Sequence, residues 1–197
     1  HLLLDGYGTK DLSREVIEDM RSAGVQVLIY RPVLAKFRRS SYRRLHRKIA
    51  VMDNRLAFVG GINIIDDMDT PGQTPPRYDY AVAVEGTLVQ AVHATARRLW
   101  GLVAWSQLKT RRRRQQRDPL SLPLADGVRA ALVLRDNIKH RRDIEDAYLD
   151  AIEQARSEVI VANAYFLPGR RFRQVLIGAS KRGVKVTLLL QGRVEYL

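Results

Sequence analysis

Apolar residues in the first half of the chain alternate between strand-like and helix-like spacing. Short apolar or alternating runs, which are typical of β-strands, occur at residues 2–4, 25–29, 49–51, 56–59 and 78–84. Helical spacing occurs between them at 12–21 and 86–105. Asp11 or Ser13 can cap the first helix, and Gly24 can end it. The pattern therefore predicts a chain that switches repeatedly between strand and helix.

The second half continues the same alternation. Strands are predicted at 128–134, 158–162 and 184–188, and helices at 144–155 and 171–181. Gly183 follows the last of these helices and can end it. Strands that alternate with helices are typical of α/β proteins, in which the helices pack on the faces of a sheet. We therefore predict an α/β fold for the chain.

The composition indicates a folded protein with a polyanionic partner. The chain has 197 residues, 46% of them apolar, which is enough for one large or two small domains with a true core. It has no cysteine, which excludes disulfides and thiolate metal sites, and no apolar run approaches the roughly 18–20 residues of a membrane span. The net charge of +13 and the pI near 10.5 indicate a nucleic acid, an anionic membrane surface or a phosphate-bearing substrate.

A run of basic residues divides the chain. Its cations are Lys109, Arg111, Arg112, Arg113, Arg114 and Arg117. We predict a first domain over 1–108, a basic linker over 109–126 and a second domain over 127–197. Two interpretations of the run stay open: a solvated charge cluster, and docking on anionic lipid, where each cation contributes about 1 kcal/mol. Nucleic-acid binding is disfavoured because no aromatic residue interleaves with the arginines to stack on bases.

The segment from His46 to Asp53 carries the strongest chemical signal. His46, Lys48 and Asp53 form the pattern His-x-Lys-x4-Asp. Alternate residues of a strand point to the same side, so His46 and Lys48 are expected next to each other. A neutral imidazole beside an ammonium group suits attack on a phosphate and binding of its oxygens. Asp53 either takes part in the chemistry or holds a turn with Asn54 and orients Lys48.

A glycine pair and an asparagine follow this motif, at Gly60-Gly61 and Asn63. Glycine lets the backbone approach a ligand closely, and the Asn63 amide can donate a hydrogen bond to a phosphate oxygen. We therefore assign Gly61 and Asn63 to substrate binding. His93 lies in the long predicted helix and is interpreted as a packing or surface residue.

A weak internal repeat predicts a second copy of the motif. Leu2-Leu3-Leu4-Asp5-Gly6 is similar to Leu188-Leu189-Leu190-Gln191-Gly192, and both runs are strand-like. No other histidine of the chain is followed by a lysine at the motif's spacing, so the same offset places the partner motif beyond Leu197. We therefore expect the chain to be truncated at both ends and inactive by itself. A site shared between two identical chains is the alternative.

The motif and the Gly-Gly-x-Asn after it resemble the phospholipase D superfamily. Softer features are similar to bacterial cardiolipin synthases: Leu-Leu-Leu-Asp-Gly at 2–6, Arg-Tyr-Asp-Tyr-Ala-Val-Ala-Val-Glu-Gly at 77–86 and Tyr-Phe-Leu-Pro at 165–168. The resemblance covers nearly the whole chain. It implies two α/β repeats, each with a mixed sheet flanked by helices and one motif at a shared cleft. The first repeat would be nearly complete here and the second partial.

The resemblance also implies roles for individual residues. His46 would be either the nucleophile or the general acid, and Lys48 and Asn63 would bind phosphate oxygens. Asp79 would hydrogen-bond the histidine and stabilise its charged form; the alternative is a surface acid at the start of a strand. The implied reaction forms cardiolipin from phosphatidylglycerol through a phosphatidyl-histidine intermediate, with no metal or other cofactor. The implied location is the bacterial cell membrane, bound peripherally on the cytoplasmic side.

Two other functions stay open. The first is a phosphodiesterase or nuclease of the same superfamily, which the charge of +13 permits. The second is a basic membrane- or nucleic-acid-binding module with a decayed active site. Within the lipid chemistry, the acceptor decides the product: a second phosphatidylglycerol gives cardiolipin, whereas water gives phosphatidic acid.

Overall fold

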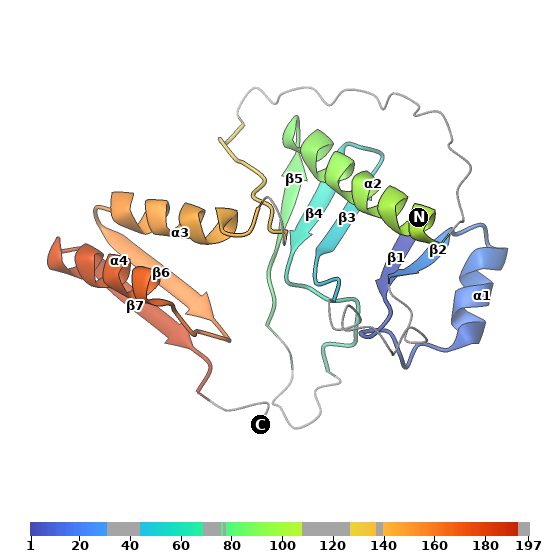
Figure 1. The fold of residues 1–197 in the computed structure, drawn as a ribbon, viewed down its shortest axis with the longest axis horizontal. Coiled ribbons are helices and arrows are strands. Elements are labelled where there is room, and N and C mark those ends of the chain that lie inside the picture. Colours follow the sequence, from blue (N-terminus) through green and yellow to red (C-terminus); the bar gives the residue numbers. More distant parts are fainter. Residues whose placement is uncertain (31–43, 69–75, 77, 108–126, 137–139, 193–197) are drawn as a thin grey trace. The chain divides into compact units, whose positions relative to one another are not determined.

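A computed structural model describes residues 1–30, 44–68, 76, 78–107, 127–136 and 140–192. Strands and helices alternate along the chain, as Figure 1 shows. The chain divides into two compact units, His1–Leu132 and Val133–Leu197. The residues of the predicted motif all belong to the first unit.

The first unit begins with two parallel strands joined through a helix. Strand β1 (Leu2–Asp5) pairs in parallel with β2 (Val27–Tyr30), and helix α1 (Arg14–Ser22) lies between them in sequence (Figure 1). Apolar side chains of these two short strands, among them Leu3 and Leu28, pack against the second half of the long helix at residues 88–106. The predicted alternation of strand, helix and strand is confirmed for this segment.

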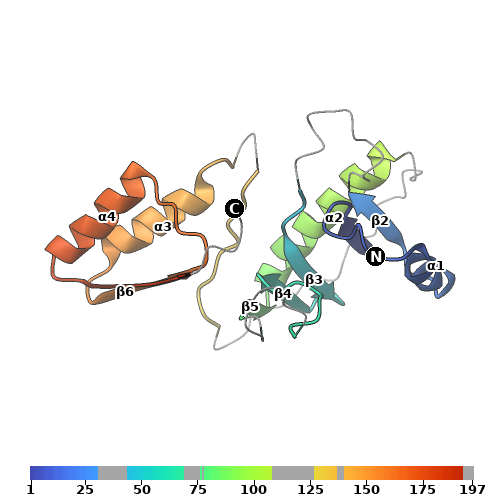
Figure 2. The same ribbon diagram turned by 90° about the horizontal axis from the view of Figure 1, so that it is seen from below.

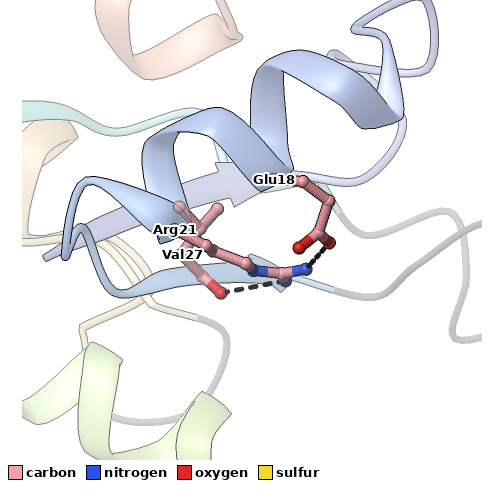
Figure 3. A network of polar contacts seen from close by, with 3 residues as sticks. All are labelled: Glu18, Arg21 and Val27. Carbon is pink, nitrogen blue, oxygen red and sulfur yellow. Dashed lines mark hydrogen bonds and ion pairs between the residues drawn. The ribbon is translucent and has the colours of Figure 1, made fainter.

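Capping and an arginine contact hold α1 in place. The hydroxyl of Ser13 accepts a hydrogen bond from a backbone amide of the first turn, which satisfies a donor that the helix leaves unpaired. Gly24, with φ of 89°, ends the helix in the left-handed conformation that glycine adopts without strain. The guanidinium of Arg21 bonds Glu18 on the helix at 2.6 Å and the carbonyl of Val27 on β2 at 3.4 Å (Figure 3).

An antiparallel sheet of three strands follows. Its order is β3 (Lys48–Met52), β4 (Leu56–Gly60) and β5 (Ala81–Glu85). Three residues, Asp53-Asn54-Arg55, join β3 to β4. The Arg55 amide donates a hydrogen bond to the Met52 carbonyl at 3.0 Å, and the two central residues of this turn, Asp53 and Asn54, have φ of 51° and 53°. Such tight hairpins need positive φ at both central positions, and Asp and Asn tolerate this conformation better than most residues. The predicted hairpin is confirmed.

One long helix, α2 (Leu88–Ser106), packs on both sheets of the first unit (Figures 1 and 2). Its first half buries Val89 and Val92 against the three-stranded sheet. Its second half buries Val103 against Leu28 of β2. Burial of such a side chain contributes about 1.5–3 kcal/mol relative to exposure. Helix α2 therefore links the two sheets of this unit into one body.

The second unit has two helices and a parallel strand pair. Its elements are α3 (Asp143–Gln154), β6 (Glu158–Asn163), α4 (Arg170–Lys181) and β7 (Lys185–Leu190). The helices cover one face of the β6–β7 pair, which Figure 2 shows, and the shared core consists of Ile152, Leu176, Ala179 and Val184. The predicted order of helix, strand, helix and strand is confirmed.

The prediction of a strand at 128–134 is wrong. Residues 127–136 form no regular element, and the side chain of Val128 is 92% exposed. Leu132 alone from this stretch joins the core around Val89 and Val92. An alternating run becomes a strand only where a neighbour supplies backbone partners, and no strand pairs with this run in the part of the chain that the structure describes.

The predicted α/β class is confirmed, with parallel and antiparallel pairing both present. In the described ranges the strands are distributed over a parallel pair, a three-stranded antiparallel sheet and a second parallel pair. The strand predicted at 78–84 begins only at Ala81, because the residues before it leave the ladder where β4 ends. That shift leaves Asp79 and Tyr80 outside the sheet, at the place where the candidate site forms.

Candidate functional site

The predicted site residues gather at one end of the three-stranded sheet. Strand β3 begins at Lys48, which pairs with Gly60 at the end of β4, and Gly60 pairs with Ala81 at the start of β5. Because neighbouring strands run in opposite directions, the start of β3, the end of β4 and the start of β5 coincide. His46 and Asp79 lie just outside this end of the sheet. His46 precedes β3 by two residues, and Asp79 precedes β5 by two residues.

Lys48 folds back toward the imidazole of His46. Its Nζ lies 3.2 Å from Nδ1 and 3.3 Å from Nε2 of His46, and it donates a hydrogen bond to the His46 carbonyl oxygen at 3.1 Å. A ring nitrogen without a proton can accept a hydrogen bond from the ammonium group. His46 is exposed and Lys48 is half-buried. The expectation that these two side chains are neighbours is confirmed.

The glycine pair lies too close to β5 for a side chain to fit. A Cβ at Gly60 would lie 2.3 Å from the carbonyl oxygen of Tyr80 and 2.4 Å from the Cα of Ala81. A Cβ at Gly61 would lie 2.9 Å from Oδ1 of Asp79, and the Gly61 amide donates a hydrogen bond to Tyr80 at 2.7 Å. The glycines therefore allow close contact between the end of β4 and the residues before and at the start of β5, and the binding of substrate by Gly61 stays a prediction.

Asp79 and Asn63 are placed near the same end of the sheet but without a bond to the histidine. The Asp79 carboxylate lies against Gly61, and both Asp79 and Asn63 are exposed. Within the described residues, the hydrogen bonds of the His46 ring are those with Lys48. The pairing of Asp79 with His46 and the contact of Asn63 with phosphate stay predictions.

Asp53 is set apart from the other two motif residues. It occupies the hairpin turn, at the opposite end of β3 from Lys48. At about 3.3 Å per residue, the backbones of Asp53 and Lys48 are separated by roughly 15 Å. The geometry thus supports the turn-holding interpretation of Asp53, whose part in the chemistry stays a prediction.

The segment leading into His46 is anchored to the first strand by Asp5. Oδ1 of Asp5 accepts a hydrogen bond from the backbone amide of Leu45 at 2.8 Å. Oδ2 accepts a second one from the amide of Gly8, also at 2.8 Å. Asp5 ends β1, so its carboxylate connects the parallel strand pair to the residue directly before His46. The sequence pattern alone predicted no role for Asp5.

A second contact joins the same two segments. The guanidinium carbon of Arg44 lies 3.9 Å from the centroid of the Tyr7 ring, within the range of a cation–π interaction. Sequence reasoning missed this contact as well. The available signal was Asp5-Gly6 directly after a strand, because such dipeptides mark turns and loops beside a rigid sheet are where sites form.

The groups at this sheet end suit chemistry on an anionic ester. They are an imidazole, an ammonium group next to it and a carboxylate close by, which can supply a nucleophile or proton carrier and bind negative oxygens. Among the described residues, no three His, Cys, Asp or Glu side chains are grouped so that they could hold a metal ion. No helix in the described ranges is long and apolar enough to cross a membrane.

Comparisons with known proteins show which proteins the chain is similar to. Residues 148–196, in the second unit, match the family model for cardiolipin synthase, PLD-like domain. Over 98% of its length, the chain is 39% identical to cardiolipin synthase B of Escherichia coli K12 and 40% identical to that of Salmonella typhi. These matches show that the chain is similar to proteins of the phospholipase D superfamily. Within that superfamily, the relatives it matches are bacterial cardiolipin synthases.

The relatives are longer than this chain. It spans about half the length of the curated relatives named above, 47% in each case. A more distant relative, the probable cardiolipin synthase YwiE of Bacillus subtilis, is 26% identical over 95% of the chain. No solved structure gives a significant match. The similarity therefore covers both units of this chain, including the segment from β1 to the glycine pair.

Proposed function

We propose that the protein formed by this chain transfers phosphatidyl groups and makes cardiolipin from phosphatidylglycerol. The observation that carries the proposal is the exposed His46 with the Lys48 ammonium within 3.3 Å of both ring nitrogens. The pair stands in a chain that is 39% identical to a cardiolipin synthase over 98% of its length. The net charge of +13 and the fold are compatible with several reactions, and the pair together with the relatives supports this one.

The proposed reaction has two displacements at phosphorus. In the first, an imidazole nitrogen bonds to phosphorus, the bond from phosphorus to the glycerol oxygen breaks, and a partner histidine gives its proton to that oxygen. In the second, the partner takes the proton from the hydroxyl of another phosphatidylglycerol, whose oxygen bonds to phosphorus and displaces the imidazole. His46 is one of these two histidines, and a second motif supplies the other.

The remaining site residues support that cycle in the proposal. The Lys48 ammonium and the Asn63 amide bind the nonbridging phosphate oxygens, which gain negative charge in each transition state. Gly61 binds substrate beside them in the proposal, and its missing side chain leaves room for the Asp79 carboxylate at this end of the sheet. Asp79 stabilises the charged imidazolium that forms as His46 acts. Asp53 holds the hairpin that presents the start of β3.

The function is tested with phosphatidylglycerol vesicles. The protein is expressed from the gene that encodes this chain, with any coding sequence that follows Leu197, and incubated with the vesicles before lipid extraction. We expect cardiolipin and free glycerol to appear in equal amounts. Formation of phosphatidic acid without cardiolipin would show that the protein hydrolyses phosphatidylglycerol and does not transfer its phosphatidyl group. Cleavage of DNA without any lipid product would favour a nuclease, and binding without turnover would favour a module that has lost its chemistry.

We further propose that the protein binds the bacterial cell membrane peripherally, on its cytoplasmic side. The support is its charge of +13 and the basic run Lys109, Arg111, Arg112, Arg113, Arg114 and Arg117, which lies outside the described residues. Cations near an anionic leaflet attract its lipids at about 1 kcal/mol each. A substrate with an anionic headgroup would be concentrated at the same surface.

Neutralising the basic run is expected to weaken vesicle binding strongly. Replacing the four arginines 111–114 with glutamine should reduce partition to phosphatidylglycerol vesicles by about a hundredfold to a thousandfold at low salt. Cosedimentation across a salt series measures this, because screening should abolish the difference between variants. The matched control replaces four exposed arginines of equal total charge: Arg129, Arg141, Arg142 and Arg156. An equal loss in the control would assign binding to net charge and not to the run.

A further inference from the structure

We propose that Asp5 is a positioning residue for His46: its carboxylate holds the backbone directly before the histidine so that the imidazole faces the substrate phosphorus. The inference rests on the proposed phosphatidyl transfer for its catalytic meaning. Its structural content, that Asp5 determines the placement of His46, stands on contacts in the first unit alone. Asp5 itself touches no reacting atom in this proposal.

The contact geometry supports a positioning role. Asp5 and Leu45 are distant in sequence, yet Oδ1 accepts the Leu45 amide at 2.8 Å. Hydrogen bonds to a carboxylate are roughly twice as strong as those between neutral groups. The amide of Leu45 belongs to the peptide plane one residue before His46. Fixing that plane leaves the dihedral angles of Leu45, the φ angle of His46 and the side-chain rotation to direct the imidazole.

The carboxylate is itself held firmly. Its second oxygen accepts the amide of Gly8 at 2.8 Å, and the Asp5 carbonyl accepts both the amide and the hydroxyl of Thr9, at 3.0 Å and 2.8 Å. The next residue, Gly6, is buried and donates its amide to the carbonyl of Tyr30 at the end of β2 at 2.9 Å. Asp5 is thus part of a closed turn on a parallel strand pair. A positioning group needs such a rigid base.

A role confined to the turn does not account for these contacts. The bond to Gly8 alone would suffice to close the turn, and Oδ1 would then be available to water. Instead Oδ1 reaches the segment that carries the histidine, and beside it the Arg44 guanidinium stacks on Tyr7 at 3.9 Å. Two consecutive residues before His46 are therefore attached to one turn.

The test separates placement of His46 from turnover. Asp5→Ala removes both acceptors. Asp5→Asn retains one acceptor oxygen and the shape of the side chain. Asp11→Ala is the matched control, because Asp11 is an exposed carboxylate of the same region that forms a 4.0 Å ion pair with Lys10. All variants are made in the same protein, and their folded fractions are measured by thermal unfolding.

The first two readouts need no activity. In Asp5→Ala, hydrogen exchange of the Leu45 amide should accelerate by about tenfold to a hundredfold, the range expected for loss of a hydrogen bond to a charged acceptor. Carbethoxylation of His46 by diethylpyrocarbonate should become several-fold faster, since the ring would no longer be held against Lys48. Asp5→Asn should fall between wild type and Asp5→Ala, and Asp11→Ala should match wild type.

The third readout is the kinetics of cardiolipin formation. Misplacement of a reacting group by about 1 Å can cost a hundredfold in rate. We therefore expect kcat of Asp5→Ala to fall by at least about tenfold with KM within about twofold, and Asp5→Asn to recover part of kcat. Unchanged Leu45 exchange and His46 labelling in folded Asp5→Ala would overturn the proposal, as would faster exchange and labelling with kcat unchanged.

Failure of the proposed function would be recognised separately. If the wild type makes no cardiolipin, the phosphatidyl transfer is rejected while exchange at Leu45 and labelling of His46 still decide whether Asp5 places the histidine. If Asp5→Ala does not fold, the same readouts on Asp5→Asn decide it, because one lost acceptor must still change the exchange rate of Leu45 or of Gly8. A change at Gly8 alone would limit Asp5 to its turn.

Discussion

Replacement of His46 with asparagine is expected to abolish cardiolipin formation while leaving the fold intact. Asparagine keeps a polar side chain at this exposed position, so the hairpin and its packing on α2 should persist. It offers neither a nitrogen nucleophile nor a proton carrier. Loss of either role in a covalent mechanism typically removes most of the rate, and we expect kcat to fall by about a thousandfold or more.

The measurement is initial-rate cardiolipin synthesis on phosphatidylglycerol vesicles, with circular dichroism to verify folding. His140→Asn is the matched control, because His140 is a half-buried histidine of the second unit that pairs with Asp143 at 2.6 Å and plays no part in the proposed site. The control should retain activity within about twofold, as expected for a surface ion pair. Retention of activity in His46→Asn would remove His46 from the mechanism.

The same variant distinguishes the two roles left open for His46. Rapid denaturation in detergent at mildly alkaline pH, where the bond from phosphorus to a histidine nitrogen persists, should trap a phosphatidyl group on the nucleophilic histidine, and peptide mass spectrometry locates it. If the adduct sits on His46 in the wild type, His46 is the nucleophile. If it sits on a histidine of a second motif and still forms slowly in His46→Asn, then His46 is the general acid that protonates the departing glycerol.

Local patterns were sufficient to predict the hairpin and the paired side chains. Alternation at 49–51 and 56–59 with Asp53-Asn54 between them is a signal contained within a few residues, and positive φ at both turn positions confirms it. The proximity of His46 and Lys48 follows from the same strand periodicity, although β3 begins only at Lys48. The sequence could therefore place the nucleophile candidate beside its cation.

Contacts between distant segments could not be predicted in this way. The bond from Asp5 to Leu45 joins the end of β1 to the segment before β3, and no periodicity relates them. The strand expected at 128–134 fails for a related reason, since alternation describes one strand and does not supply its partner. The glycine pair was correctly located, but whether a glycine makes room for a ligand or for Tyr80 depends on the tertiary contact.

The tight contact at Gly60 leads to the largest stability effect that we expect. In Gly60→Ala, the new methyl group would lie 2.3 Å from the Tyr80 carbonyl oxygen and 2.4 Å from the Cα of Ala81. Both are backbone atoms, so relief requires β4 and β5 to separate at their paired ends. Overpacking of this kind costs about 1–3 kcal/mol and sometimes more. We expect the free energy of unfolding to fall by about 3 kcal/mol, because no flexible side chain can move away.

Two other glycines provide controls, because their substitution is expected to change the stability in a different direction or to act on a different group. Gly101→Ala places a methyl group in open space on α2 and should stabilise the unit by about 1 kcal/mol through helix propensity. Gly61→Ala meets the Asp79 carboxylate at 2.9 Å, which can rotate away, so it should cost little stability but displace that carboxylate from the site.

Urea unfolding followed by tryptophan fluorescence measures all three variants, since Trp100 and Trp105 both lie in α2 and report on the first unit. A Gly60→Ala protein as stable as the wild type would show that the two backbones are not in contact as described. If Gly61→Ala were folded and fully active, Asp79 would lose its proposed role. The two variants thus separate Gly60, whose substitution should lower the stability of the sheet, from Gly61, whose substitution should displace the Asp79 carboxylate.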